Sequence, residues 1–161
     1  MSLTYIPFDL PGKIYRSPMP FARFDYDHTV FQEYLEAGID SVVMLIEEGE
    51  DLELAGQDLK SLYAQNGIDV IHYSIVDFGT PEDSQKLEDH LEIVLDRVKQ
   101  GEHIAVHCFA GQGRTGMFLA LLARRILKID GDQAISFVRQ YFQAVETEAQ
   151  QQIVIDYQIP E

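Results

Sequence analysis

The sequence contains one cysteine, Cys108, so no intramolecular disulfide is possible. We expect a reducing, cytoplasmic setting and a thiol that is free for chemistry. Positive charge is also scarce, because 12 lysines and arginines stand against 27 aspartates and glutamates, for a formal net charge of −15. Proteins that bind nucleic acids or anionic membranes carry basic surfaces, so the sequence argues against both kinds of partner.

Long hydrophobic runs are missing as well. No apolar stretch reaches membrane-spanning length, and residues 1–12 lack the basic and then apolar segments of a signal peptide. The 161 residues are 46% hydrophobic and 24% charged, which is typical of a globular protein. We therefore expect one domain over residues 1–161, with residues 1–12 as an irregular N-terminal arm.

Short and long apolar stretches alternate along the chain. The short ones have strand length and cover residues 13–16, 39–46, 70–76 and 103–106. The long ones have helical spacing and predict helices at 27–37, 54–65, 80–101, 117–127, 130–142 and from residue 147. This alternation predicts an α/β fold with a single, mostly parallel central sheet flanked by helices on both faces. Ligands of such sheets bind beyond the carboxyl ends of the strands.

Polar residues mark several boundaries between these elements. Thr80, followed by Pro81, is expected to cap the helix at 80–101, and Asp130 to cap the helix at 130–142. Residues 47–53 include five acids without an apolar face, and we expect a solvated loop there.

Two arginines accompany the proline-containing segment 17–24. Arg16 precedes it and Arg23 lies within it, together with two phenylalanines. This segment fits either a wall beside a phosphoaryl substrate or a packed loop with solvated arginines.

Residues 107–116, His-Cys-Phe-Ala-Gly-Gln-Gly-Arg-Thr-Gly, join a predicted strand to a predicted helix. The backbone N–H groups of such a glycine-rich turn, with a helix N-terminus behind them, form a cradle for an anion. Amide donors, a helix dipole and the guanidinium of Arg114 all favour the thiolate of Cys108. A nucleophile and an oxyanion clamp in one loop indicate attack on phosphorus.

The same residues resemble the signature of the cysteine-dependent protein tyrosine phosphatases, and every fixed position of that signature is present. The resemblance covers roughly residues 13–158 and is strongest to the small dual-specificity-like enzymes. It implies that Cys108 attacks phosphorus and that Thr115 assists its departure in the second step. His107 is expected to order the cysteine. The phosphate would be held by Arg114 and by the loop residues Phe109, Ala110, Gly111, Gln112 and Gly113. No cofactor or metal is required.

Asp77 ends a predicted strand and is the candidate general acid. The sequence Asp-Phe-Gly-x-Pro-Glu from Asp77 resembles the tail of the movable acid-bearing loop of the tyrosine-specific phosphatases, and Asp77 precedes Cys108 by 31 residues. Gly79 would let this loop hinge. The competing interpretation is a solvated aspartate that caps the next helix from outside.

Gln150 lies in Glu-Thr-Glu-Ala-Gln, which resembles a segment of small dual-specificity enzymes near the catalytic loop. The resemblance implies that Gln150 orients water. Alternatively, Thr147 and Gln150 form only a capping box at the start of the last helix.

The sequence therefore predicts a phosphoprotein phosphatase that hydrolyses phosphotyrosine monoesters through a phosphocysteine, with phosphoserine and phosphothreonine left open. Several alternatives remain. A catalytically silent phosphopeptide-binding module has the same fold, and a sulfurtransferase also uses a cysteine loop. A non-protein substrate such as a phosphoinositide is disfavoured by Phe109 and Gln112, where lipid-directed relatives tend to have lysines. Residues 111–116 also fit a dinucleotide fingerprint, but no acid-ended strand follows. A buried structural cysteine would not need Arg114.

Overall fold

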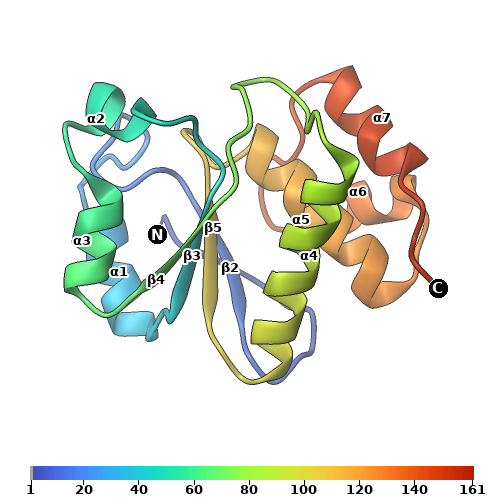
Figure 1. Ribbon diagram of the computed structural model, residues 1–161, viewed down its shortest axis with the longest axis horizontal. Helices are drawn as coiled ribbons and strands as arrows, with labels where there is room; N and C mark the ends of the chain where they lie inside the picture. The colour runs from blue at the N-terminus through green and yellow to red at the C-terminus, as the bar shows by residue number, and fades with distance from the viewer. Residues whose placement is uncertain (1) are drawn as a thin grey trace.

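The computed structural model describes residues 2–161, which form a central sheet with helices on both faces (Figure 1). The strands are β1 (Thr4–Ile6), β2 (Ile14–Ser17), β3 (Ser41–Met44), β4 (Asp69–His72) and β5 (Ile104–His107). They lie in the order β1-β2-β5-β3-β4. β1 is antiparallel to β2, and all other neighbours are parallel. The predicted α/β class and mostly parallel sheet are confirmed.

Two helical layers cover the sheet (Figure 1). One contains α1 (Val30–Ala37) and α3 (Leu59–Gln65), with α2 (Glu50–Ala55) at the upper edge of the view; the other contains α4 (Ser84–Lys99), α5 (Gly113–Leu127), α6 (Gly131–Arg139) and α7 (Glu148–Asp156). Side chains alternate between these layers along each strand. Val42 and Val43 of β3 are both fully buried, but they belong to the cores on opposite faces.

The parallel register brings the carboxyl ends of three strands to one level. Ser17 of β2 and Met44 of β3 both pair with His107, the last residue of β5. The segments that follow these strands therefore meet at the upper edge of the sheet in Figure 1. This edge is the site that the sequence predicts for ligands.

The N-terminal arm is more ordered than predicted. Residues 4–6 form β1 at the edge of the sheet, so the prediction of an irregular arm is wrong for these residues. Ile6 is fully buried, and the rings of Tyr5 and Tyr15 lie 5.6 Å apart across the two strands. Such a short edge strand has only one inward side chain, so its sequence shows no clear alternation.

The region predicted as one acidic loop and one helix contains two helices instead. Residues 50–55 form α2, although the sequence predicted a solvated loop over 47–53. The helix predicted over 54–65 is interrupted at Gly56, whose φ of 66° ends α2 in the left-handed conformation. Asp58 then opens α3 by accepting a hydrogen bond from the N–H of Ser61. Glycine adopts this left-handed conformation without steric strain. The helix therefore ends at Gly56, although the helical pattern of the sequence continues.

Helix caps were predicted with mixed success. Asp130 caps α6 as predicted, and it does so within a full capping box. Thr80 does not cap α4, because the helix begins only at Ser84 and Asp83 accepts from the N–H groups of Gln85 and Lys86. An aspartate three positions after the helix's predicted start is as good a cap as threonine, and the earlier residues stay in a loop.

Candidate active site

The segment between β5 and α5, which we call the cysteine loop (residues 108–113), has its first carbonyl groups bound from outside. The carbonyl of Cys108 accepts a hydrogen bond from Nδ1 of His107 at 3.0 Å. The carbonyl of Phe109 accepts from the backbone N–H of Met19 at 2.9 Å. These contacts come from β5 itself and from the segment that follows β2.

The next three carbonyl groups are also bound from outside. Nη2 of Arg16 donates to the carbonyl of Ala110 at 3.1 Å and to that of Gly111 at 2.7 Å, and Nε donates to Gly111 at 3.0 Å. The carbonyl of Gln112 accepts from the backbone N–H of Val145 at 3.1 Å. Every carbonyl from residue 108 to residue 112 therefore has a donor.

The backbone N–H groups of the loop, unlike its carbonyl groups, are not bound by other described parts of the protein. Within residues 2–161, the backbone N–H groups of residues 109–112 donate to no protein acceptor. α5 begins at Gly113, so the positive end of its dipole lies behind the loop. Cys108 is the first residue of the loop and directly precedes these donors. It is only 2% exposed. The arrangement can hold an oxyanion in front of a buried thiol.

Arg114 adds a buried guanidinium to these donors. Its side chain is inaccessible to solvent, and its Nη1 donates to the carbonyls of Leu45 at 3.3 Å and Ile75 at 2.9 Å. Among the atoms that the structure describes, Nε has no partner. Burial lowers the pKa of Arg114, but the hydrogen bonds that Arg114 donates to Glu50 and the attraction of Cys108 outweigh it, so the pKa lies above its usual value. The group is a permanent cation beside the thiol.

Two carboxylates contact this guanidinium. Glu50, at the start of α2, accepts from Nη1 at 2.9 Å and from Nη2 at 2.8 Å. Asp77 lies 3.3 Å from Nη2 through its Oδ1. The sequence placed Glu50 in a solvated loop and so missed it. Its role depends on a contact across 64 residues, for which the sequence carried no local signal.

Asp77 begins a short loop (residues 77–83, the Asp77 loop) between β4 and α4. Its side chain is 41% exposed and accepts a hydrogen bond from the N–H of Phe78 at 3.0 Å. Phe78 takes the positive φ of 61°, and Gly79 does not. Gly79 is required for another reason: a Cβ there would approach the carbonyl of Val76 to 2.7 Å. Asp83 rather than Asp77 caps α4, so the competing capping interpretation of Asp77 does not apply.

His107 is fully buried and linked to the cysteine through the backbone. A carbonyl can only accept, so Nδ1 carries the proton that is donated to the carbonyl of Cys108. Nε2 then accepts from the hydroxyl of Tyr63, 3.0 Å away. Burial, assisted by the nearby Arg114 and opposed by the hydrogen bond to Cys108, lowers the pKa of His107 to about 4. The imidazole is neutral near pH 7.

Two further predicted site residues lie beside the loop. Thr115 is buried in the first turn of α5, and its hydroxyl has no hydrogen-bond partner among the described residues. Gln150 is also buried and forms the capping box of α7 with Thr147. Its Nε2 donates to the carbonyl of Gly79 at 3.2 Å, so it ties α7 to the Asp77 loop.

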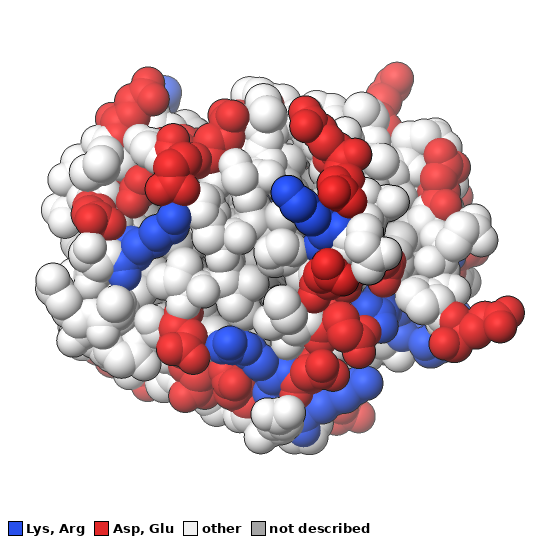
Figure 2. Space-filling view, viewed as in Figure 1, with Lys and Arg blue, Asp and Glu red and all other residues white. Residues whose placement is uncertain are grey.

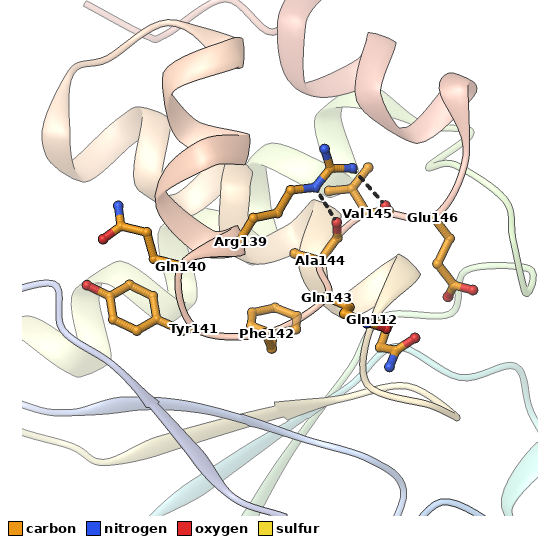
Figure 3. Close-up of a pocket in the computed structure, with 9 residues that line it drawn as sticks. All are labelled: Gln112, Arg139, Gln140, Tyr141, Phe142, Gln143, Ala144, Val145 and Glu146. Atoms are coloured by element: carbon orange, nitrogen blue, oxygen red, sulfur yellow. Dashed lines mark hydrogen bonds between the residues drawn. The ribbon is translucent and has the colours of Figure 1, made fainter.

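A cavity of about 730 Å³ flanks the loop on the side of α6 and α7, and Gln112, Tyr141, Phe142 and Glu146 are among its lining residues (Figure 3). Arg139 also lines it, but its guanidinium donates to the carbonyls of Ala144 at 2.8 Å and Val145 at 3.1 Å, as the dashed lines in Figure 3 mark. The charged side chains in the lining of this cavity are therefore Arg139, whose guanidinium is bound to backbone carbonyls, and Glu146.

A smaller cavity of about 300 Å³ flanks the loop on the other side. It is lined by Arg16, Phe24, Tyr26 and Asp27, among others. Arg16 is bound to the loop rather than solvated, so the interpretation of a packed loop with solvated arginines does not describe it, whereas a wall beside a phosphoaryl substrate stays a prediction. On the face drawn in Figure 2, acidic side chains gather along the upper edge, above the ends of the strands. Asp27, Asp77 and Glu146 lie near the loop, and Arg114 is the one arginine there that is fully buried among the described residues.

Among the described residues, no three His, Cys, Asp or Glu side chains are grouped to hold a metal ion. In the same part of the chain, no helix is both long enough and apolar enough to cross a membrane.

Comparison with known sequences gives a consistent result. Residues 24–126 match a family described as a polymorphic toxin system DSP-PTPase phosphatase. The chain is 33% identical over 113 residues to an inferred tyrosine phosphatase, 067L, of Invertebrate iridescent virus 3. It is 28% identical over 120 residues to protein tyrosine phosphatase domain-containing protein 1 of Mus musculus. These matches cover 68% and 70% of this chain, but only 44% and 16% of the relatives.

Solved structures share the fold. The kinase-associated phosphatase with its catalytic cysteine replaced by serine has a TM-score of 0.84 at 22% identity, over 94% of this chain and 90% of that one. The active form of Tk-PTP has a TM-score of 0.75 at 25% identity, over 92% of both chains. PTPMT1 in complex with PI(5)P has a TM-score of 0.75 at 18% identity, over 94% of this chain and 92% of that one.

Proposed function

The chain belongs to the DSP-PTPase phosphatases, the small dual-specificity-like members of the protein tyrosine phosphatase superfamily, and we propose that it hydrolyses phosphotyrosine in proteins through a phosphocysteine intermediate. One observation carries the proposal. The buried thiol of Cys108 lies at the start of a loop whose carbonyl groups are bound from outside. Among the described residues, the N–H groups of residues 109–112 have no protein acceptor, and Nε of the adjacent Arg114 has no partner. Such donors stabilise the equatorial oxygens of a phosphoryl group under attack.

In the first step, the sulfur of Cys108 attacks phosphorus and the bond from phosphorus to the tyrosyl oxygen breaks. Asp77 donates its proton to the departing oxygen, and its carboxyl group lies beside the guanidinium that would hold the phosphate. In the second step, Asp77 takes a proton from water as the water attacks phosphorus, and the phosphorus–sulfur bond breaks. Phosphate leaves, and the hydroxyl of Thr115 would stabilise the returning thiolate.

Gln150 remains a proposed participant. Its side-chain oxygen already accepts from the N–H groups of Glu146 at 2.9 Å and Thr147 at 3.3 Å. Its amide nitrogen contacts Gly79 and so would position the Asp77 loop. Orientation of the attacking water by Gln150 stays a prediction.

The surroundings of the cysteine loop favour a phosphoprotein substrate. Phe78 is 59% exposed and Tyr26 is 81% exposed, so aromatic faces stand beside the loop where a phosphotyrosyl ring would enter. Arg16 and Arg139, the arginines in the two flanking cavities, already bind backbone carbonyls. A second phosphate, as in a phosphoinositide, would meet Asp27 or Glu146 instead. The opposing observation is the fold shared with PTPMT1 in complex with PI(5)P.

The test is hydrolysis of p-nitrophenyl phosphate with EDTA present, followed by a panel of phosphotyrosyl, phosphoseryl and phosphothreonyl peptides and of phosphoinositides in vesicles. We expect turnover that EDTA does not affect and a preference for phosphotyrosyl peptides. Cys108→Ser should abolish turnover but keep phosphate affinity within about tenfold, because the loop donors remain. Phosphate binding without turnover by the unaltered enzyme would indicate a silent binding module, and faster turnover of phosphoinositides would overturn the protein substrate.

A further inference from the structure

The guanidinium of Arg16 donates most of its hydrogen bonds to backbone carbonyls of the cysteine loop. Nη2 contacts the carbonyls of Ala110 and Gly111, and Nε contacts Gly111 again. Nη1 reaches the carbonyl of Ser2 at 3.4 Å. The guanidinium carbon also lies 5.0 Å from the ring centre of Phe142, so the ring packs against the guanidinium. Arg16 forms no ion pair with a carboxylate among the described residues.

The sheet explains how Arg16 reaches the loop. β2 pairs with β5 in parallel register, with Arg16 opposite Val106. The end of β2 therefore lies beside the start of the cysteine loop. Gly111 adopts a φ of 76°, and a Cβ on it would collide with the carbonyl of Ser17 and with Nη2 of Arg16. The loop and the strand end are in direct contact, without space between them.

The two carbonyls that Arg16 binds belong to the same peptide groups as two inward N–H donors. The carbonyl of Ala110 shares a peptide group with the N–H of Gly111, and the carbonyl of Gly111 shares one with the N–H of Gln112. Fixing a carbonyl outside the loop fixes its N–H inside. A cation on the carbonyl oxygen also polarises the amide and makes its N–H a stronger donor.

The charge of Arg16 also acts on the thiol. Burial lowers the pKa of Arg16, and the attraction of Cys108 and Tyr34 raises it. The guanidinium is bound to the loop that begins with Cys108, and a cation held close to a thiol favours the thiolate.

We propose that Arg16 is a positioning residue of the active site, which holds the N–H groups of Gly111 and Gln112 toward the phosphoryl group and supplies a second, partly buried cation, behind the loop, to Cys108. The inference rests on the proposed function, since it describes the same site at work on a phosphate. It assigns Arg16 no contact with the substrate.

The protein offers a matched control for this arginine. Arg124 also donates to backbone carbonyls, those of Ile129 at 3.0 Å and Val154 at 3.1 Å. Its guanidinium carbon also packs over an aromatic ring, 5.8 Å from the centre of Tyr157. These contacts tie α5 to the C-terminal segment, far along α5 from the cysteine loop. Arg16→Met and Arg124→Met therefore remove the same interactions at two places.

Three measurements separate positioning from simple stabilisation: phosphate affinity in a Cys108→Ser background, kcat and KM for p-nitrophenyl phosphate, and the rate at which iodoacetamide alkylates Cys108 at pH 6. We expect Arg16→Met to weaken phosphate binding and to lower kcat by roughly 10-fold to 100-fold each, and to slow alkylation. Arg124→Met should lower thermal stability while leaving all three readouts unchanged. Arg16→Lys should restore the alkylation rate, because it keeps the charge, but not phosphate affinity, because one ammonium lacks the planar fork that binds both carbonyls.

Equal readouts for Arg16→Met and Arg124→Met, apart from thermal stability, would overturn the proposal, and so would recovery of phosphate affinity in Arg16→Lys. If Arg16→Met does not fold, Arg16→Lys decides alone: its phosphate affinity should fall, and an unchanged affinity contradicts the positioning role. Phosphate binding in the Cys108→Ser background needs no turnover. A failure of the unaltered enzyme to hydrolyse any phosphoester would therefore refute the proposed function separately from the role of Arg16.

Discussion

Glu50 binds the guanidinium of Arg114 through two parallel hydrogen bonds, of 2.9 Å and 2.8 Å, and so fixes the plane of the group that faces the thiol. The pair is nearly buried, with side-chain exposures of 0% for Arg114 and 10% for Glu50. A bidentate contact of this kind is stronger and more directional than a single hydrogen bond. Through this contact α2, a short acidic helix far from Arg114 in the sequence, contributes a side chain to the candidate active site.

Glu50→Ala should therefore lower kcat by about 10-fold to 100-fold, since a hydrogen bond to a charged group contributes about 1.5–3 kcal/mol. Glu50→Gln should lose less, because an amide oxygen can still accept from one nitrogen of Arg114. Steady-state kinetics with p-nitrophenyl phosphate measure both. Glu48→Ala is the control, because Glu48 lies in the same segment, is exposed and binds Lys60 instead. Equal activity of the Glu48 and Glu50 variants would remove Glu50 from the site.

Asp77→Asn should lower kcat for phenyl and alkyl phosphates by roughly 10²–10⁴, the usual contribution of a general acid. The loss should shrink for substrates whose leaving groups are strongly acidic, because these depart without a proton. A series of aryl phosphates measures this dependence. Glu82→Gln, in the same loop and exposed, should behave like the unaltered enzyme. If Asp77→Asn loses the same factor with every leaving group, Asp77 orders the loop or Arg114 and is not the acid.

These residues mark what the sequence could and could not predict. Cys108, Arg114 and their loop could be predicted as a candidate site because all their determinants are consecutive in the chain, between one strand and one helix. Asp77 could be predicted as a candidate because strand ends of a parallel sheet meet, and the structure brings its carboxylate to 3.3 Å from Arg114. The contacts of Glu50 with Arg114 and of Arg16 with the cysteine loop were not predicted, because they join residues 64 and 94 to 95 positions apart.

The secondary structure has a similar limit. Long amphipathic helices such as α4 and α5 were predicted because many residues contribute to their periodicity. α2 and β1 are short, and their side chains find partners only in the folded protein. The start of α4 was misplaced because Thr80 and Asp83 are both good caps, and the choice between them depends on where the Asp77 loop ends.

Stability should depend on pH through His107. The pKa of its imidazole falls from 6.5 to about 4 on folding, mainly through burial, so the unfolded chain binds a proton that the folded chain does not between these values. Stability is therefore unaffected above pH 6.5 and decreases as the pH falls toward 4, by up to about 3 kcal/mol at 1.36 kcal/mol per pKa unit.

His107→Gln isolates this contribution, because glutamine can still donate to the carbonyl of Cys108 and accept from Tyr63. Urea unfolding of both proteins at pH 7, 6, 5 and 4 gives the difference in their free energies of unfolding. The advantage of the unaltered protein should shrink as the pH falls, whereas the acidic groups common to both proteins cancel. A difference that stays constant over this range would contradict a buried, neutral His107.

The last prediction concerns oxidation of Cys108. A thiolate held by amide donors, Arg114 and Arg16 reacts with peroxide to give a sulfenic acid first. The chain has no second cysteine to trap this species, so the available internal partner is the backbone nitrogen of Phe109, which has no protein acceptor in the described structure. Attack of that nitrogen on sulfur expels water and forms a sulfenamide, two hydrogens lighter than the thiol form.

Mild peroxide should therefore inactivate the enzyme reversibly, with activity restored by added thiol, and excess peroxide should convert Cys108 irreversibly to the sulfinic acid. Intact mass spectrometry distinguishes the cyclised form from the sulfinic acid and, after thiol treatment, from a mixed disulfide. Cys108→Ser serves as the control, because it should show none of these mass changes. An enzyme that keeps full activity in excess peroxide would contradict the reactive thiolate on which the proposed mechanism depends.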